Sequence, residues 1–348
     1  MQFEASSSFA GRVPAAPPVI APVAGPGPRP LWSVMIPTYN CLVYLRDALE
    51  SVLANDPGPA LMQIVVVDDA STDGDVEGLV RALGRGRVGF FRQPTNRGSL
   101  RNFETCLNLA RGEWVHLLHG DDRVTPGFYA EIEMLLRRHP EAGAAFTNVL
   151  HMKGEYAEPF ASEPLLPAPG ILPNFLLRLA QGQIIQPPAI VVKRRVYEQL
   201  GGFFAVHYGE DWEMWTRIAA HCPVAYSPRC LAHYRYLNGA SLTLRSLATG
   251  QNIRDVTTVI DIMQDYLPAA DRVRIRRVAR RHYADYCVAL AHSLYETDPP
   301  TAFVQAHGAL GMSAGAGVLY MVLKLYVKDF VRYKELKKLW RGTALSRA

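Results

Sequence analysis

Pairs of adjacent acidic residues occur at three places where the sequence changes its character. The pairs are Asp68 with Asp69, Asp121 with Asp122, and Glu210 with Asp211. The first two pairs follow short apolar runs of strand type, and the third opens a segment with helical periodicity. A single acidic residue at such a place commonly caps the next helix. Two adjacent carboxylates repel each other unless a proton or a cation lies between them, so pairs at the ends of different strands indicate a functional site.

Short apolar runs alternate with helical segments in the part of the chain that carries these pairs. Four runs read as strands, namely residues 31–37, 63–68, 88–91 and 114–118. Between them, apolar residues recur at helical spacing across 42–53 and 100–110. This alternation is typical of an α/β fold, a mostly parallel sheet flanked by helices. Ligands of such sheets bind beyond the carboxyl ends of the strands, where the first two acidic pairs are expected.

The remaining sequence divides into a leader, a domain and an extension. Residues 1–30 contain seven prolines and six alanines and show no periodicity, which predicts a disordered leader. The leader has no basic stretch followed by an apolar core, so we expect no secretory signal. Residues 31–244 form the predicted α/β domain, with a proline-rich surface loop at 158–173. Residues 245–348 have helical texture and are predicted to form a helical C-terminal extension.

Six motifs occur in an order and spacing that resemble those of a known enzyme family. They are Ser33–Asn40 (SVMIPTYN), Val66–Asp73 (VVDDASTD), Asn96–Gly98 (NRG), Arg111–Trp114 (RGEW), Leu118–Asp122 (LHGDD) and Gly209–Trp212 (GEDW). Together they make residues 31–240 similar to the family 2 glycosyltransferases, which have the GT-A fold. The resemblance implies transfer of a sugar from a nucleoside diphosphate donor, with inversion at the anomeric carbon.

The resemblance assigns a metal site to the second acidic pair. The family holds Mg²⁺ or Mn²⁺ against the donor diphosphate, and such cations prefer oxygen ligands. By register, Asp122 would contact the metal, and Asp121 would lie nearer the donor ribose or sugar. Many relatives have another Asp two positions before this pair, whereas this chain has His119, which puts a site of three acids in question. His233 and Arg235 lie where some relatives contact metal or diphosphate, with a surface histidine as the simpler interpretation.

The resemblance also places the nucleotide. Asp69 matches the family's acid that accepts a hydrogen bond from the base, and Asp68 is expected to hold the loop. Two further groups would line the nucleotide pocket: Pro37, Thr38 and Asn40 after the first strand, and Asn96 with Arg97 before the second helix. A plain turn is the alternative for Pro37 and Thr38. The expected donor is a UDP- or dTDP-sugar.

Asp211 matches the family's general base. Inverting transfer is a single displacement, so the acceptor hydroxyl must lose its proton to a carboxylate within hydrogen-bond reach. The alternative is an acid at a helix N-terminus, which the helix dipole stabilises by at most about 1 kcal/mol. Glu210, Trp212 and Trp215 are expected at the acceptor site, with core packing as the alternative for the two tryptophans. The acceptor would be a glycan or a lipid-linked glycan.

Two other functions can be weighed against the residues. A sugar-phosphate nucleotidyltransferase would need a glycine-rich, lysine-bearing loop after the first strand, where this chain has Thr38–Leu42 (TYNCL). A catalytically silent glycan-binding protein of the same fold would tolerate the loss of acids that this chain retains. The Gln-x-x-Arg-Trp signature of processive synthases is absent from the sequence, which favours addition of a single sugar.

The net charge of +5 lies in the C-terminal tail. Lys324–Arg341 contains seven basic and two acidic residues, so the rest of the chain is nearly neutral, which is a poor profile for binding nucleic acid. Within residues 311–341, apolar residues alternate with lysines and arginines at helical spacing. We interpret this segment as an amphipathic helix that contacts the membrane surface peripherally. The alternative is a helix packed on the catalytic domain.

Five cysteines, an odd number without a C-x-x-C pair, argue against a disulfide framework and a zinc ribbon. They fit the reducing cytoplasm. We therefore expect a cytoplasmic protein that contacts the inner face of the membrane through its tail.

Overall fold

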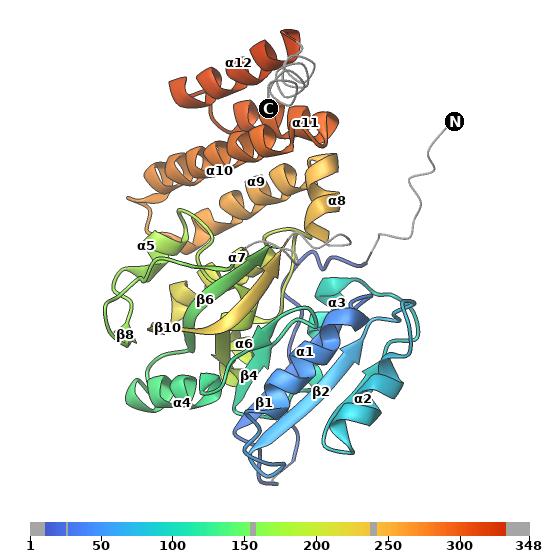
Figure 1. The fold of residues 1–348 in the computed structure, drawn as a ribbon. Coiled ribbons are helices and arrows are strands. Elements are labelled where there is room, and N and C mark those ends of the chain that lie inside the picture. Colours follow the sequence, from blue (N-terminus) through green and yellow to red (C-terminus); the bar gives the residue numbers. More distant parts are fainter. Residues whose placement is uncertain (1–10, 26, 154–157, 237–241, 332–348) are drawn as a thin grey trace, which may run out of the picture. The chain divides into compact units, whose positions relative to one another are not determined.

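The computed structural model describes residues 11–25, 27–153, 158–236 and 242–331 (Figure 1). The chain forms two compact units. Unit 1 comprises Met1–Leu179 with Gln183–Asn238, and unit 2 comprises Ala180–Gly182 with Gly239–Ala348. The sequence predicts this division after residue 244.

Unit 1 is built on a sheet of ten strands in the order β3-β2-β1-β4-β9-β6-β10-β5, with β7 paired to β6 and β8 to β10. The strands are β1 (Trp32–Thr38), β2 (Met62–Asp68), β3 (Gly89–Arg92), β4 (Trp114–Leu117), β5 (Arg123–Val124), β6 (Ala144–Lys153), β7 (Phe160–Ala161), β8 (Gly170–Ile171), β9 (Ile190–Lys193) and β10 (Val224–Tyr236). Strands β1 to β4 pair in parallel, as do β6 and β10, while β9 runs antiparallel between β4 and β6. The predicted α/β fold with a mostly parallel sheet is confirmed.

Helices cover both faces of this sheet. The helices of unit 1 are α1 (Leu42–Leu53), α2 (Val76–Gly84), α3 (Ser99–Leu109), α4 (Phe128–Arg138), α5 (Phe175–Leu179), α6 (Arg194–Leu200) and α7 (Glu210–His221). On one face, apolar side chains of α1, α2 and α4 form one core cluster with those of β1, β2, β6 and β10. On the other face, Phe203 joins α3 to α7, because its ring centroid lies 5.3 Å from that of Phe103 and 5.8 Å from that of Trp215. Burial on both faces explains why β1 is mostly apolar, since the strand is buried along its whole length.

The region 158–193 differs in detail from the sequence prediction. The predicted loop at 158–173 contains the short strands β7 and β8. A 3₁₀ turn, Pro187–Ala189, precedes β9, so the strand is shorter than the run 184–193 suggested. Proline lacks the N–H that a central strand must donate, so the strand begins only after the two prolines, at Ile190.

The leader is where the sequence prediction is wrong for the described residues. Ile20 is 1% exposed, and burying such a side chain contributes about 2 kcal/mol. Backbone N–H groups of the domain donate to three proline carbonyls of the leader: Ala205 to Pro14 (2.9 Å), Gly202 to Pro18 (2.8 Å) and Glu113 to Pro30 (3.2 Å). A proline-rich segment has no hydrogen bonds of its own, but its fixed φ and free carbonyls let it dock as an extended strand. Residues 11–25 and 27–30 are therefore packed on unit 1.

Unit 2 consists of helices, namely α8 (Leu242–Thr249), α9 (Gln251–Met263), the 3₁₀ turn Gln264–Tyr266, α10 (Arg272–Leu294), α11 (Pro299–Met312) and α12 (Ala316–Phe330). Asn252, which is fully buried, donates to Gln305 Oε1 (2.9 Å) and to the Tyr283 hydroxyl (3.2 Å), which joins α9, α10 and α11. The Asp298 carboxylate caps α11 by accepting from Thr301 N, and Pro299 occupies the first helical turn. Among the described residues, no helix is long and apolar enough to cross a membrane.

Candidate active site

The loops after β1 and β2 are tied together by Asn40. The Asn40 backbone N–H donates to Ser71 Oγ (2.9 Å), and its side-chain oxygen accepts from Thr72 N (2.8 Å). Its φ of 48° lies in the left-handed region, which asparagine tolerates better than most residues. Asp68 also holds this loop, because it accepts from Ser71 N (3.1 Å) and pairs with the Arg92 guanidinium. Asn40 is thus placed as a loop-shaping residue beside Pro37 and Thr38, which are both buried.

Asp69 is the first residue after β2 and is 2% exposed. Its two carboxylate oxygens accept the backbone N–H groups of Arg97 (2.7 Å) and Gly98 (2.9 Å), and its carbonyl oxygen accepts from Asn96 Nδ2 (3.3 Å). Burial raises the pKa of Asp69, which these two N–H donors and the charge of Arg12 oppose. These hydrogen bonds join Asp69 to the turn that contains Asn96 and Arg97. The Arg97 side chain is exposed.

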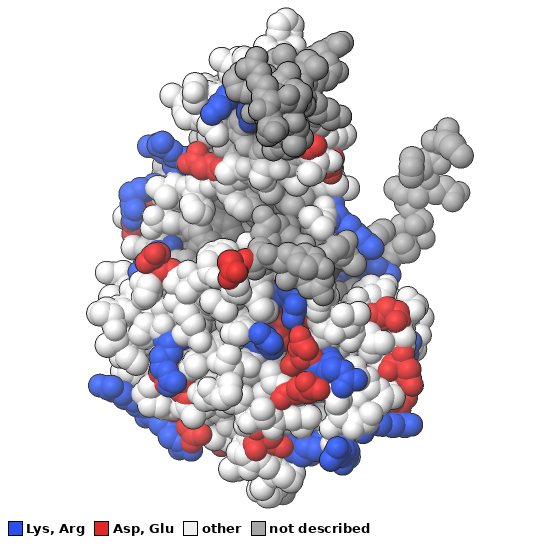
Figure 2. Space-filling view, viewed as in Figure 1, with Lys and Arg blue, Asp and Glu red and all other residues white. Residues whose placement is uncertain are grey.

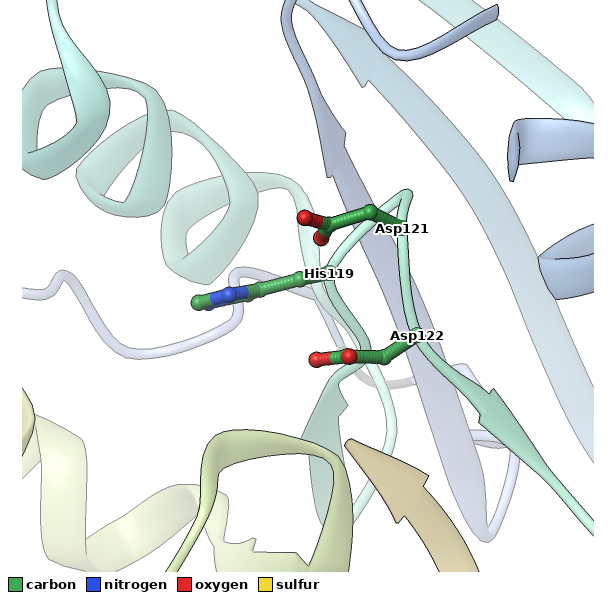
Figure 3. A group of neighbouring side chains, drawn as sticks. All are labelled: His119, Asp121 and Asp122. Atoms are coloured by element: carbon green, nitrogen blue, oxygen red, sulfur yellow. The ribbon is translucent and has the colours of Figure 1, made fainter. Parts of the chain in front are cut away.

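The loop after β4 brings three potential metal ligands together. His119, Asp121 and Asp122 each offer one ligand atom, and these atoms lie within 4.8 Å of one another. In Figure 3 the three side chains project to the same side of this loop. The loop can approach β1 closely only because residue 120 is glycine: an added Cβ would lie 2.8 Å from Cys41 Sγ and 2.9 Å from Thr38 Oγ1. The position at which many relatives carry a third acid is thus occupied here by an imidazole at the same site.

Asp122 is the buried member of this group, at 1% exposed. One of its oxygens accepts from Arg235 N (2.8 Å), whereas Oδ2 is buried and has no hydrogen-bond partner among the described residues. Burial and the charge of Asp121 raise the pKa of Asp122 well above its ordinary value. A buried carboxylate oxygen without a partner is costly, and a bound cation would remove that cost. The donor set of two carboxylates and one imidazole therefore fits a divalent metal ion.

The side chains of Arg235 and His233 bind other residues of the protein in this structure. Arg235 Nε donates to Asp121 O (3.0 Å), its Nη2 lies 3.3 Å from Asp47 Oδ2, and its guanidinium stacks 4.4 Å from the Tyr44 ring. His233 Nδ1 accepts from Arg123 Nε (3.0 Å). The two residues hold the metal-ligand loop against β10, whose register shifts at Cys230.

Asp211 occupies the first turn of α7, after Gly209 at φ 85°. Its Oδ1 accepts from Trp212 N (2.7 Å), and its Oδ2 accepts from Gln183 Nε2 (2.6 Å). Burial raises the pKa of Asp211 to about 6, and these two donors limit the rise. A buried ion pair within α7, between Arg217 and Glu213 (3.0 Å), fixes the helix to the chain before it, since Arg217 also donates to Gly202 O (2.8 Å). The helix thus presents a carboxylate suited to accept a proton near neutral pH.

The two tryptophans expected at the acceptor site are buried. Trp212 is 3% exposed, and its Nε1 donates to Leu179 O (2.7 Å). Trp215 is equally buried and lines a small void together with His119, Glu210 and Asp211. In this structure Trp212 is packed in the core, which was the alternative for the two tryptophans. Glu210 and Trp215 border the void beside Asp211.

Gln183 links Asp211 to a larger cavity of about 280 Å³. The polar side chains of its lining include Asn148, Ser162, Gln183 and Gln186. Gln183 Oε1 is buried and has no hydrogen-bond partner among the described residues. Sequence reasoning missed Gln183, because nothing near it in the sequence indicates its contact with α7.

Two of the acidic pairs lie in one region, because His119 lines the same void as Glu210 and Asp211, and the charges of both pairs act on Tyr234. Burial raises the pKa of its hydroxyl well above the ordinary value, and so do the negative charges of Asp122, Asp211, Asp121 and Glu210. Cys41 lies between the loop after β2 and the loop after β4. Burial and the negative charges of Asp121, Asp73 and Asp68 raise the pKa of its thiol to about 12. The loops after β1, β2 and β4, the start of α7 and strand β10 therefore meet at one end of the sheet. Acidic and basic side chains are interspersed over unit 1 on the face seen in Figure 2.

Comparisons with known proteins agree with this geometry. Residues 33–201 match the model of glycosyl transferase family 2. Residues 33–201 form a family 2 glycosyltransferase domain. An uncharacterised protein of Mycobacterium tuberculosis is 29% identical over 241 residues, which cover 65% of this chain and 73% of that protein. An uncharacterised glycosyltransferase of Mycoplasma genitalium is 31% identical over 96 residues, which cover 26% of this chain and only 32% of that enzyme.

Solved glycosyltransferases share the fold of this domain. S. aureus TarS 1–349 in complex with UDP-GlcNAc aligns with a TM-score of 0.60 and 15% identity, covering 90% of this chain and 92% of TarS. The mannosyltransferase PcManGT from Pyrobaculum calidifontis, in complex with GDP-Man and Mn²⁺, aligns with a TM-score of 0.55 and 20% identity, covering 91% of this chain and 90% of that one. These likenesses establish the GT-A fold predicted from the motifs.

Proposed function

We propose that the protein is an inverting glycosyltransferase that moves a single sugar from a nucleoside diphosphate sugar to a hydroxyl of a glycan or lipid-linked glycan. One observation carries the proposal. Asp122, whose buried Oδ2 lacks a partner among the described residues, belongs to the same ligand group as His119, and His119 lines the same small void as Asp211, whose pKa is about 6. The first carboxylate suits a cation and the second suits a general base, which are the two groups that inverting transfer requires.

Asp122, Asp121 and His119 would hold Mg²⁺ or Mn²⁺, which as a Lewis acid would neutralise the charge that develops on the departing diphosphate. The protein fixes the orientation of these ligands. The Arg235 N–H holds one oxygen of Asp122, and Arg235 Nε holds the Asp121 carbonyl. Burial lowers the pKa of His119, so its imidazole is neutral and keeps a nitrogen lone pair for binding.

Asp211 would take the acceptor proton. The acceptor oxygen forms a bond to the anomeric carbon, the bond from that carbon to the diphosphate oxygen breaks, and the proton passes to Asp211. Gln183 donates to one oxygen of Asp211 and so restrains the carboxylate without supplying a proton of its own to the reaction. The cavity beside Gln183 supports an acceptor rich in hydroxyl groups, because Gln183 Oε1 needs a donor there.

The donor proposal rests on the motifs and on two structural neighbours. TarS binds UDP-GlcNAc, and PcManGT binds GDP-Man with Mn²⁺. Both ligands are nucleoside diphosphate sugars, which supports this class of donor for the present protein. Asp69, Asn96 and Arg97 would form the base side of the pocket, with Pro37, Thr38 and Asn40 beside them.

A donor screen tests the function. The purified full-length protein is incubated with UDP-, dTDP- and GDP-sugars and Mn²⁺, and release of the nucleoside diphosphate is measured with and without glycan acceptors. We expect release from one nucleotide class, with UDP- or dTDP-sugars favoured, and faster release with an acceptor. A protein that releases no diphosphate from any donor and binds none of the nucleotides would be a silent relative and would refute the proposal.

We also propose that the protein is cytoplasmic and attaches to an anionic membrane surface through α12. The buried face of α12 carries Val318, Val322 and Leu325. Its other side leaves large apolar side chains in solvent: Leu319 (49% exposed), Tyr320 (64%), Leu323 (63%), Val327 (52%) and Phe330 (89%). Lys324 and Lys328 belong to the same helix, and each basic residue near an anionic surface contributes about 1 kcal/mol. An exposed apolar face with basic residues is typical of an interfacial helix.

Vesicle flotation tests this attachment. Wild-type protein is expected to float with vesicles that contain phosphatidylglycerol and to stay behind with pure phosphatidylcholine or at high salt. Leu319→Ser combined with Leu323→Ser should abolish flotation, because both side chains are exposed and their loss leaves the buried face of α12 intact. Val273→Ser is the matched control, since Val273 is 71% exposed on α10. Flotation of the double variant at the wild-type level would exclude α12 as the contact.

A further inference from the structure

The described part of the leader reaches the turn that holds Asp69. Arg12 Nη2 donates to Asn96 O (3.2 Å), and Arg101 Nε donates to Gly11 O (2.7 Å). Gly98 packs against the Arg12 stem, because a Cβ added there would lie 3.3 Å from Arg12 Cβ. The turn Asn96–Gly98 is therefore bordered by leader residues as well as by Asp69.

The turn leads directly into α3, since Gly98 precedes this helix and its carbonyl oxygen accepts from Asn102 N (3.0 Å). Its N–H groups at Arg97 and Gly98 are used on the Asp69 carboxylate, and Gly98 has a φ of 88°, a conformation that only glycine adopts without strain. The charge of Arg12 lowers the pKa of Asp69 and so favours the ionised form that accepts both N–H groups. Arg12 thus acts on both partners of this contact, on the Asn96 carbonyl directly and on Asp69 by its charge.

The rest of the leader is anchored independently of this turn. Ala205 N donates to Pro14 O (2.9 Å), Gly202 N donates to Pro18 O (2.8 Å), and Arg194 Nη2 donates to Ala21 O (2.8 Å). Ile20 lies in the core. Gly201 allows this approach, since a Cβ there would lie 2.8 Å from Pro17 Cβ. Residues 11–21, called the strap below, are thus fixed along their length and deliver Arg12 to a defined position.

We propose that the strap holds the turn Asn96–Gly98 in the conformation that binds the donor nucleotide, with Arg12 as the positioning residue. The inference rests on the proposed function, because it concerns the nucleotide pocket of the same site. Arg12 acts through the turn and not on the reacting atoms. A turn that is already ordered loses less conformational entropy when the nucleotide binds, so the strap increases affinity for the donor.

Arg12→Ala tests the role of the strap by its effect on donor binding. Because hydrogen bonds from charged groups are the stronger ones, we expect KM for the donor and Kd for the nucleoside diphosphate to rise about tenfold, with kcat nearly unchanged. Arg12→Lys keeps the charge but loses the fork of donors, and should give an intermediate value.

Arg29→Ala is the matched control. Arg29 is also a leader arginine that donates to backbone carbonyls, those of Arg111 (2.8 Å) and Gly112 (3.1 Å), but these precede β4 at the amino end of the sheet. Its loss should lower thermal stability as Arg12→Ala does, without changing donor affinity. Equal effects of the two variants on KM would show that the strap is only structural and would overturn the proposal.

Hydrogen exchange separates this proposal from the proposed function, because it needs no nucleotide. In Arg12→Ala the amides of Arg97 and Gly98 should exchange faster than in wild type, while in Arg29→Ala they should exchange at the wild-type rate. Unchanged exchange at both amides in Arg12→Ala would refute the strap. If exchange is faster in Arg12→Ala but the wild-type protein binds no nucleotide, the effect of the strap on the turn stands and the proposed function is refuted.

Discussion

Asp211→Asn is expected to lower the rate of sugar transfer by about 10²–10⁴-fold while donor and metal affinities stay within a fewfold of wild type. Asparagine keeps a carbonyl oxygen that can accept the Trp212 N–H, so the first turn of α7 should stay in place. It cannot take up the acceptor proton. The rate is measured as nucleoside diphosphate release in the presence of acceptor, and binding is measured by calorimetry.

The pH dependence of the wild type gives a second readout of the same carboxylate. The pKa of Asp211 is raised to about 6 by burial, so the base form is lost as the pH falls through this value. Transfer should therefore decrease about tenfold for each unit of pH below about 6. Asp211→Asn should lack this acid limb.

A variant at another helix start serves as the control. Asp75 caps α2 by accepting from Gly78 N, and asparagine is an equally good cap, so Asp75→Asn should keep full activity. Transfer by Asp211→Asn at more than a tenth of the wild-type rate, with an unchanged acid limb, would move the base to another residue.

Asp122→Asn is expected to lower transfer by on the order of 10²–10³-fold and to remove its dependence on Mn²⁺. The new side chain keeps the oxygen that accepts the Arg235 N–H, so the loop after β4 should hold its shape. It replaces an unpartnered, charged oxygen beside Asp121 with an amide. The measurement is the rate as a function of Mn²⁺ concentration.

The stability of this variant distinguishes loss of metal from loss of fold. The raised pKa of Asp122 means that burial and Asp121 penalise its ionised form in the folded state. Removing this charge should leave the melting temperature without metal unchanged or higher, and Mn²⁺ should no longer raise it. A lower melting temperature without metal, or Mn²⁺ stabilisation equal to that of wild type, would contradict the assignment of Asp122 as a ligand.

The sequence predicts the elements that burial makes periodic and the residues that end them. Strands β1, β2 and β4 are mostly apolar because helices cover both faces, so they are recognisable from composition. Asp68 ends β2, and Asp122 follows β4 within a short loop. The resemblance of the motifs to the family supplied the expected roles of the acidic residues in metal binding and catalysis. The structure brings His119 and its neighbours Asp121 and Asp122 close to the void that Glu210 and Asp211 line, while the roles of these residues stay predictions.

Contacts between distant segments were not predictable in this way. Gln183 reaches Asp211 through a side chain whose neighbours in sequence show no acidic or helical pattern. The leader was predicted to be disordered because its prolines prevent helix and sheet, yet those prolines supply free carbonyls to Gly202 and Ala205. Trp212 could stack on a sugar or pack in the core, and only its buried contact with Leu179 decides between them here. Each case depends on tertiary packing, which the local pattern does not encode.

Calorimetric titration of the purified protein with UDP, dTDP and GDP, in Mn²⁺ and in EDTA, tests the central claim most directly. The claim is that residues from separate strands and α7 form one site in which a divalent cation binds a nucleoside diphosphate. We predict saturable binding of one of these nucleotides in Mn²⁺, strongly weakened in EDTA and in Asp122→Asn, and retained in Asp211→Asn. Binding of none of them, or equal binding of one with and without the metal, would contradict the account.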